Sequence, residues 1–592
     1  MGLSRLAKRG WLLLFLSIAA FYLWGLNVLP LVGPDEPLYS EVAREMFLRR
    51  DFVTTTLGGH TWFEKPSLLY WMMMAGYRVF GVGEHGARIG PALSGLLTGV
   101  FVYWIGSTIE RLRAVPGSAL NSAAGQAEPR RGGLARWSTL IWLSSLGAMI
   151  FSRAASYDIL ITMALAGALA CFLVWYVRSA GIAGSPARQP RWGDVTAGGP
   201  PPSAAADAVT DFGIRRASAW LLLGFYFFIG VSLLAKGLIG IVIPVGIIGI
   251  YFLLRRESPP RSFVKSLLWG VPLALAVAAV WYGPVIHRHG WEFIDEFIVQ
   301  HHFARYLTNK YHHPEPFYFY GPVLIAYSFP WTIFLAAAFI SARRWKWRGE
   351  TSLDRLRVFA LVWVIVPIIF FSLSGSKLTA YILPVLPAAA LLVGDRITQF
   401  LREQRGDTVI RLTGLLLIGL AIFGGWYLAR GFQGSPSIIV VAALPLAIAG
   451  AAALVRPQLR KGLLVLIPIA LFVTSAVALK GAGPILGRPE SVRDLLIAAS
   501  ARGYGATPVV QLHTLERTAE FYAAGRMSYG SGGEPIKLEG ATQVIDAARR
   551  NGGVVLCFVP LEYESQLTSY PSIQTEVIGD NTRAALIAVR VR

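Results

Sequence analysis

Residues 11–31 of the chain read WLLLFLSIAAFYLWGLNVLPL, and residues 32–46 continue VGPDEPLYSEVAREM. An apolar run of about 20 residues is long enough to cross a bilayer as a helix. The acidic pair Asp35 and Glu36 follows at once, so it lies at the membrane surface. Charges there are costly unless they pair with one another or take part in chemistry. The stretch therefore predicts a membrane-spanning helix with a functional site at its outer end.

The composition of the whole chain agrees with a protein that crosses the membrane many times. Its 592 residues are 54% hydrophobic and only 15% charged, and the mean hydropathy is +0.52. This profile is typical of polytopic membrane proteins. The net charge of +21 comes from clusters of Arg and Lys in every second connection between apolar runs, such as Arg255/Arg256 and Arg343/Arg344. That distribution follows the positive-inside rule and argues against nucleic-acid binding.

Thirteen apolar runs are long enough, or nearly so, to span about 30 Å of hydrocarbon. With a cytoplasmic N-terminus, this odd number places the C-terminal tail outside and every basic cluster inside. No small-residue cleavage site precedes residue 33, so we expect the first run to be kept as a helix rather than removed as a signal peptide. The runs cover residues 11–31, 88–108, 137–152, 159–178, 218–235, 237–254, 266–286, 321–341, 356–373, 378–395, 410–429, 436–455 and 462–480.

Two domains are expected, a transmembrane domain over residues 1–483 and a small α/β domain over residues 484–592. The first outer segment, residues 32–87, should contain helices that lie along the membrane surface. Two cytoplasmic loops, residues 114–135 and 179–214, are low in complexity. In the tail, helical patterns alternate with β-rich runs. The helical patterns cover 491–502 and 541–550, and the β-rich runs cover 507–512, 553–559 and 584–591.

Two acidic motifs occur in the first outer segment. Asp35 and Glu36 have two readings of about equal weight: acids that stabilise a helix N-terminus, or site residues. The second motif, Phe63-Glu64-Lys65-Pro66, adds an acid and a cation to the same segment. Together the motifs could form a carboxylate-rich site that holds a divalent metal or orients an acceptor.

Histidines concentrate in the second outer segment, residues 287–320. Six of the nine histidines lie between His287 and His313, and His301 and His302 are adjacent. Such clustering beside a membrane favours contact with a metal or a phosphate. Arg305 follows closely, and its guanidinium could form a forked contact with a phosphate.

A third motif, FSLSGSKLTAYILP, covers residues 371–384. Lys377 and Tyr381 are four residues apart, so a helix beginning here would place them on one face. Serines, a glycine and a lysine at a helix N-terminus make an anion site. The alternative is a lysine that extends from a span end to the membrane surface. Arg153, Asp158 and Lys236 also flank spans, and each is as well explained by anchoring as by a site role.

Taken together, these motifs resemble those of the bacterial polyprenyl-phosphate-sugar glycosyltransferases of the GT-C class. The lipid A 4-amino-4-deoxy-L-arabinose transferases are the closest of these, and the protein O-mannosyltransferases are more distant. Motifs carry the resemblance over residues 1–395, and only the layout matches beyond. Leu38 stands where an arginine is usual, and Ser67 replaces a second proline. These departures, with His301-His302 in place of Glu-His, bear on the acceptor and the sugar more than on the reaction class.

The resemblance implies a role for each matching residue. Asp35 and Glu36 would be catalytic, with Asp35 facing the acceptor. Glu64 would bind a divalent metal (Zn, Mg or Mn) together with His301 or His302. The donor phosphate would be held by Lys65, Arg305, Lys377 and Tyr381. The acceptor side of the cavity would include Tyr39, Arg44, Arg153 and Asp158.

The function that this implies is inverting transfer of a sugar from undecaprenyl phosphate to a periplasmic acceptor, with lipid A phosphate as the first expectation. Transfer of a hexose to another lipid, glycan or protein hydroxyl is the alternative within the class. A transporter for a lipid-linked sugar is a separate alternative, which internal repeats and broken helices would favour. We expect a monomer in the bacterial inner membrane, with the site and the C-terminal domain in the periplasm.

Overall fold

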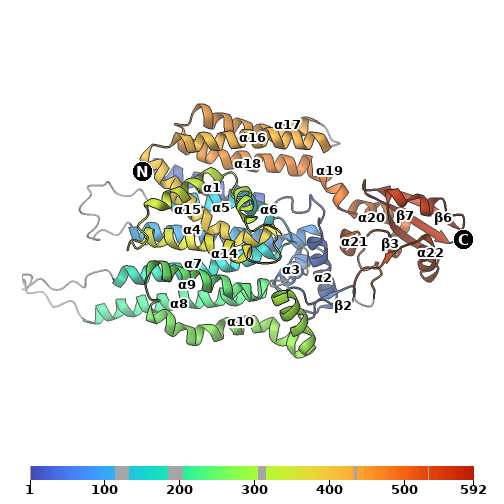
Figure 1. Ribbon diagram of the computed structural model, residues 1–592, viewed down its shortest axis with the longest axis horizontal. Helices are drawn as coiled ribbons and strands as arrows, with labels where there is room; N and C mark the ends of the chain where they lie inside the picture. Colours follow the sequence, from blue (N-terminus) through green and yellow to red (C-terminus); the bar gives the residue numbers. More distant parts are fainter. Residues whose placement is uncertain are drawn as a thin grey trace, which may run out of the picture.

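The computed structural model describes residues 2–113, 133–183, 204–304, 315–431, 436–530 and 533–591. Long helices run side by side to form the body of the molecule, and a small sheet domain lies at one end (Figure 1). The low-complexity loops predicted at 114–135 and 179–214 lie mostly outside the described residues.

Nine helices in the described part of the chain are long and apolar enough to cross a membrane. This confirms a polytopic helical protein. The other four predicted runs fall on the shorter apolar helices α1 and α9, on the pair α5 and α6, and on the bent pair α12 and α13. The count of thirteen crossings therefore stays a prediction. The helices of the body are α1 (Gly2–Leu23), α4 (Glu84–Arg113), α5 (Leu134–Ser144), α6 (Leu146–Phe151), α7 (Tyr157–Ala183), α8 (Ala204–Lys236), α9 (Ile239–Arg255), α10 (Arg261–Phe293), α12 (Tyr320–Tyr327), α13 (Thr332–Ser341), α14 (Ser352–Ser372), α15 (Leu386–Glu403), α16 (Asp407–Gly431), α17 (Pro436–Val455) and α18 (Arg460–Gly481).

Two interrupted helices pack against each other inside the body. The chain is extended at Ser145 between α5 and α6, and it bends by 117° between α12 and α13. The Leu146 amide donates to the Phe329 carbonyl (2.9 Å), and the Trp331 indole donates to the Ser144 hydroxyl (2.9 Å). Interrupted helices are tolerated in a membrane where neighbouring protein groups satisfy the freed backbone. The two breaks satisfy each other in this way.

The first outer segment folds into two helices joined by a short hairpin. They are α2 (Asp35–Arg49) and α3 (Leu68–Phe80), and the hairpin strands are β1 (Thr56–Leu57) and β2 (His60–Thr61). Gly58 and Gly59 form the turn with φ of 60° and 82°, a conformation that glycine adopts without strain. Both helices lie between the body and the sheet domain (Figure 1), as expected for surface-lying helices.

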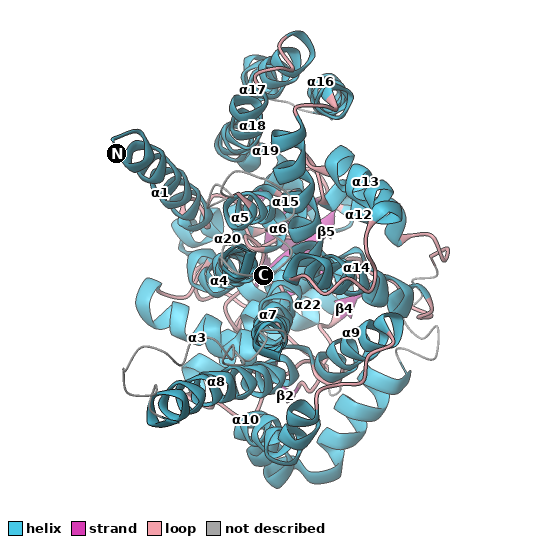
Figure 2. Cartoon of the chain, turned by 90° about the vertical axis from the view of Figure 1, so that its left-hand side faces the viewer, coloured by secondary structure: helices cyan, strands magenta, loops and turns pink. Residues whose placement is uncertain are grey.

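The three helices α16, α17 and α18 form a separate layer at one side of the body, seen at the top of Figure 2. The short helix α19 (Gly483–Gly487) then leads to the tail domain. That domain holds a mixed five-stranded sheet in the order β4-β3-β5-β7-β6, in which β3 is parallel to both neighbours. The predicted α/β domain is confirmed. Its elements are α20 (Arg493–Ala499), β3 (Val509–Leu512), α21 (Arg517–Tyr522), β4 (Lys537–Leu538), α22 (Ala541–Arg550), β5 (Val554–Pro560), β6 (Ile573–Asp580) and β7 (Ala584–Val591).

Candidate active site

The acidic pair divides at the start of α2. Asp35 is the first residue of the helix and is exposed, whereas Glu36 is buried. Acids in a first helical turn interact favourably with the helix dipole. The two readings of the pair are thus not exclusive, because one acid can support the helix while its neighbour faces solvent.

Glu36 is held in a buried ion pair with Arg88 of α4. The Arg88 guanidinium donates to both carboxylate oxygens of Glu36, at 3.0 and 2.7 Å. The Ala155 amide (2.5 Å) and the Val32 amide (3.2 Å) also donate to this carboxylate. A carboxylate with this many donors orders the backbone around it. The catalytic role assigned to Glu36 stays a prediction, and its contacts favour a positioning role.

Tyr39 connects Asp35 with the other acids of the site. Its ring is buried and lies edge-on to Tyr157, with ring centroids 5.0 Å apart. Burial raises the pKa of Tyr39 well above its usual range, and the charges of Asp35, Glu64 and Asp158 raise it further. The three carboxylates that act on this phenol come from three separate segments of the chain.

Glu64 and Lys65 form an ion pair beside the hairpin. Phe63, which follows the hairpin, contacts α10 and the helix after it, since its ring lies 4.9 Å from the ring of His289 and its amide donates to Glu296 (3.2 Å). This joins the first outer segment to the second, as the predicted site requires. Lys65 lies beside the acids, where it could also meet an anionic ligand.

Among the described side chains, no group of three or more His, Cys, Asp or Glu residues comes together in the manner of a metal site. Glu64 already pairs with Lys65, a cation that competes with a metal for its oxygens. His301 and His302 lie in η1 (Ile294–Ala304), with side chains outside the described set. Metal binding by Glu64 and a histidine stays a prediction.

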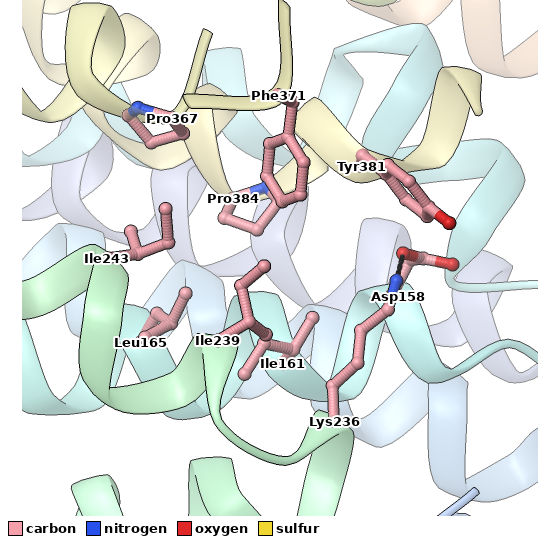
Figure 3. A pocket seen from close by; sticks show the side chains of 10 residues that line it. All are labelled: Asp158, Ile161, Leu165, Lys236, Ile239, Ile243, Pro367, Phe371, Tyr381 and Pro384. Carbon is pink, nitrogen blue, oxygen red and sulfur yellow. Dashed lines mark hydrogen bonds and ion pairs between the residues drawn. The ribbon is translucent and has the colours of Figure 1, made fainter. Parts of the chain in front are cut away.

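A narrow cavity in the body brings Asp158, Lys236 and Tyr381 together (Figure 3). The Lys236 ammonium pairs with Asp158 and lies 4.7 Å from the centre of the Tyr381 ring. Lys236 therefore belongs to the cavity rather than acting only as a span anchor. The rest of the lining is apolar and consists of Ile161, Leu165, Ile239, Ile243, Pro367, Phe371 and Pro384.

Lys377 lies at the end of α14 in an unusual environment. It is only 8% exposed, and its ammonium has no hydrogen bond or ion pair within the described ranges. The neighbouring Ser376 is 1% exposed, and its hydroxyl is buried without a hydrogen-bond partner there. A buried cation without a counter-charge is costly, so this pair suits an anionic ligand.

The shared helix face predicted for Lys377 and Tyr381 is wrong. Leu378 is extended (φ −118°, ψ 145°), and the 3₁₀-helix η3 begins only at Thr379. Because Lys377 precedes this helix, the four-residue spacing does not align it with Tyr381. The Tyr381 ring instead lies beside Lys236.

Two other predicted residues, Arg153 and Arg44, do not line the cavity that holds Asp158. Arg153 donates to the carbonyls of Phe21 and Trp24, both at 2.7 Å, and so holds the end of α1. Arg44 forms two hydrogen bonds with Glu41 (2.6 and 2.5 Å) on the side of α2 that faces the tail domain. Arg305 lies outside the described residues.

No protein-family model matches this chain. It is 29% identical over 385 residues to an undecaprenyl phosphate-α-4-amino-4-deoxy-L-arabinose arabinosyl transferase of Erwinia tasmaniensis, covering 64% of this chain and 58% of that protein. A Pseudomonas aeruginosa protein of the same name is 28% identical over 419 residues, covering 70% of this chain and 64% of that protein.

Solved structures give a match over nearly the whole chain. ArnT from Cupriavidus metallidurans, in a crystal structure bound to undecaprenyl phosphate, has a TM-score of 0.70 at 23% identity and covers 98% of both chains. The chain has the fold of ArnT. Apo ArnT matches with a TM-score of 0.69. The predicted GT-C fold and the resemblance to the aminoarabinosyl transferases are confirmed, while the chain spans 58% of the Erwinia relative's length.

Proposed function

We propose that this protein is an inverting glycosyltransferase that moves a sugar from an undecaprenyl-phosphate carrier to an acceptor on the outer face of the bacterial inner membrane. The first acceptor to test is the phosphate of lipid A, with an aminopentose as the sugar. The relatives' names and the shared ArnT fold support the reaction class. Transfer of a hexose to another acceptor is the alternative that Leu38 and Ser67 leave open.

One observation carries this proposal, the buried Lys377 beside the Ser376 hydroxyl. Neither group has a partner in the described part of the chain, and both lie next to the apolar helices of the body. A donor whose sugar is joined through phosphate to a long apolar chain presents an anion at the edge of the hydrocarbon. The lysine and the serine would bind that phosphate, and a charged hydrogen bond in a dry site contributes more than one in water.

The reaction needs one bond to form and one to break. An acceptor oxygen attacks the anomeric carbon, and the bond between that carbon and the phosphate oxygen breaks. Its electron pair stays on the phosphate, so negative charge increases there as undecaprenyl phosphate leaves. Lys377 and Lys65 would stabilise this charge, which lowers the barrier where water is excluded. Attack from the face opposite the phosphate inverts the anomeric centre.

Asp35 would act on the acceptor. A lipid A phosphate is largely ionised at neutral pH, so Asp35 would then orient it through its neighbours rather than remove a proton. A hydroxyl acceptor would need Asp35 as general base, to take the proton as the new bond forms.

The transporter alternative has one feature in its favour, because α5/α6 and α12/α13 are interrupted helices of the kind found in transporters. The Leu146 amide at one break donates to the Phe329 carbonyl at the other, however, and the relatives are named as transferases. The same experiment separates the two functions, since a transporter would bind the lipid-linked sugar without transferring it.

The test is the variant Asp35→Asn, assayed with purified protein, membrane lipid extract and mass spectrometry of the products. Loss of orientation of a phosphate acceptor can cost about 100-fold, and loss of a general base for a hydroxyl acceptor costs about 10²–10⁴-fold, so transfer should fall by at least about 100-fold with either acceptor. The matched control is Asp546→Asn, an exposed acid on α22 of the tail domain, which should transfer normally. Near-normal transfer by Asp35→Asn would remove Asp35 from the reaction, and a wild-type protein that transfers nothing would overturn the proposed function.

A further inference from the structure

The tail domain is joined to the site through helix α21. Phe521 of this helix is buried in the same apolar core as Tyr39 and Val42 of α2, and α21 packs directly against α2. The domain therefore contacts the helix that carries Asp35, although nearly 500 residues separate the two in sequence. The position of α2 therefore depends in part on the packing of α21 against it.

Tyr522, the last residue of α21, bonds to two groups of the membrane body. Its hydroxyl accepts from the Leu31 amide (2.7 Å) and donates to the Glu84 carboxylate (2.8 Å). Burial and the charge of Glu84 raise the pKa of Tyr522, so the phenol keeps the proton that it donates. Arg493 of the tail domain also contacts Glu84, at 3.2 Å.

Arg88 continues this network one helical turn beyond Glu84 on α4. All of its N–H groups are in use: they donate to the carbonyls of Leu26 (2.8 Å), Leu29 (2.7 Å) and Pro30 (2.7 Å) and to both oxygens of Glu36. The loop of residues 26–31 is thus fixed from one end by Arg88 and from the other by Tyr522. Asp35 follows this loop directly and adjoins Glu36.

We propose that Tyr522 and Arg88 are positioning residues for Asp35, so that the tail domain sets the geometry of the transfer site through the loop of residues 26–31. This inference rests on the proposed function. The reacting groups must be held within a fraction of an ångström, and a misplacement of about 1 Å can lower a rate by about 100-fold. Neither residue touches the substrate in this scheme, and both act through the start of α2.

The test uses the full-length protein with Tyr522→Phe, which keeps the ring and its packing and removes the hydroxyl. The value of kcat should fall about tenfold while the donor KM and the thermal unfolding midpoint stay near those of the wild type. Tyr563→Phe is the matched control, because Tyr563 is exposed on the same domain and has no hydroxyl hydrogen bond within the described residues. Glu84→Gln, which retains an acceptor for Tyr522, should lie between the two.

A double-mutant cycle with Asp35→Asn decides whether the effect passes through Asp35. If it does, adding Tyr522→Phe to Asp35→Asn leaves the residual rate unchanged. Additive losses would show a general structural effect and overturn the inference, as would an unchanged kcat for Tyr522→Phe alone. Absence of transfer by the wild type would instead refute the proposed function, so the two failures are distinguishable.

Discussion

At the scale of single residues, Lys377 offers the sharpest test of donor binding. We expect Lys377→Ala to raise the donor KM by about 10- to 100-fold, since a hydrogen bond to a charged group contributes about 1.5–3 kcal/mol. Lys377→Arg keeps the charge and should recover part of the affinity. Donor titration of the purified variants measures both effects.

The control for Lys377 is Lys480→Ala. Lys480 is an exposed lysine at the end of α18, and it represents the alternative of a lysine that merely extends to the membrane surface. If both variants change the donor KM equally, or neither does, the phosphate site at Lys377 is refuted.

Asp35 and Glu36 show which parts of the site sequence reasoning can find. The motif marks the start of α2, whereas the first helix α1 ends at Leu23, eight residues before the end of the predicted run 11–31. It could not assign separate environments to two adjacent acids, since these depend on Arg88, which lies far along the chain. One signal was available in the sequence, because Arg88 is the first residue of the apolar run 88–108. A cation in that position indicates an anionic partner elsewhere in the chain. The site roles themselves stay predictions.

At the scale of elements, the hairpin turn can be tested with two glycines. A Cβ on Gly58 would lie 2.4 Å from Cγ of Tyr529, whereas one on Gly59 would meet nothing within 4 Å. Both residues have positive φ, so alanine costs each about 1–2 kcal/mol of backbone strain. Gly58→Ala should lose about 1–3 kcal/mol more through overpacking. Thermal unfolding in detergent compares the two, and equal midpoints would show that Tyr529 does not hold the hairpin.

The elements that sequence reasoning missed have a common cause. The breaks at Ser145 and between α12 and α13 fall in apolar sequence, and tertiary hydrogen bonds between the two breaks stabilise them. Periodicity does not reveal such partners. The runs that became β3, β5 and β7 were predictable because these strands are mostly buried, whereas β6 at the sheet edge is only partly buried and its burial has no clear alternation.

At the scale of the whole molecule, docking of the tail domain should depend on pH through Glu41. Burial raises the pKa of Glu41 to about 7, although Arg44 lowers it, and the neighbouring acids Glu45 and Glu520 add to the rise. The folded protein thus holds this proton more tightly than the unfolded chain. Its contribution to stability is complete below about pH 4.5 and is lost as the pH rises through about 7.

Thermal unfolding at pH 5 and pH 8 measures this contribution. The wild type should unfold at a lower temperature at pH 8, and Glu41→Gln, which carries no charge at either pH, should reduce the difference. Glu562→Gln, at an exposed acid of the tail domain, serves as the control. An undiminished pH difference in Glu41→Gln would assign the effect to other groups.

The distribution of charges predicts the orientation of the molecule in the membrane, and single cysteines can test it. The two native cysteines, Cys171 and Cys557, are buried and free, so they should react poorly with a membrane-impermeant thiol reagent. Ser565→Cys lies exposed on the tail domain, and Ser258→Cys lies exposed in the basic connection between α9 and α10. The positive-inside rule places residue 258 in the cytoplasm and, with an odd number of crossings, residue 565 in the periplasm.

In intact spheroplasts we expect labelling at 565 alone, with 258 labelled only after permeabilisation. Labelling of both sites from outside, or of 258 alone, would require an even number of crossings or a reversed chain, and either result would separate the site at Asp35 from a periplasmic acceptor.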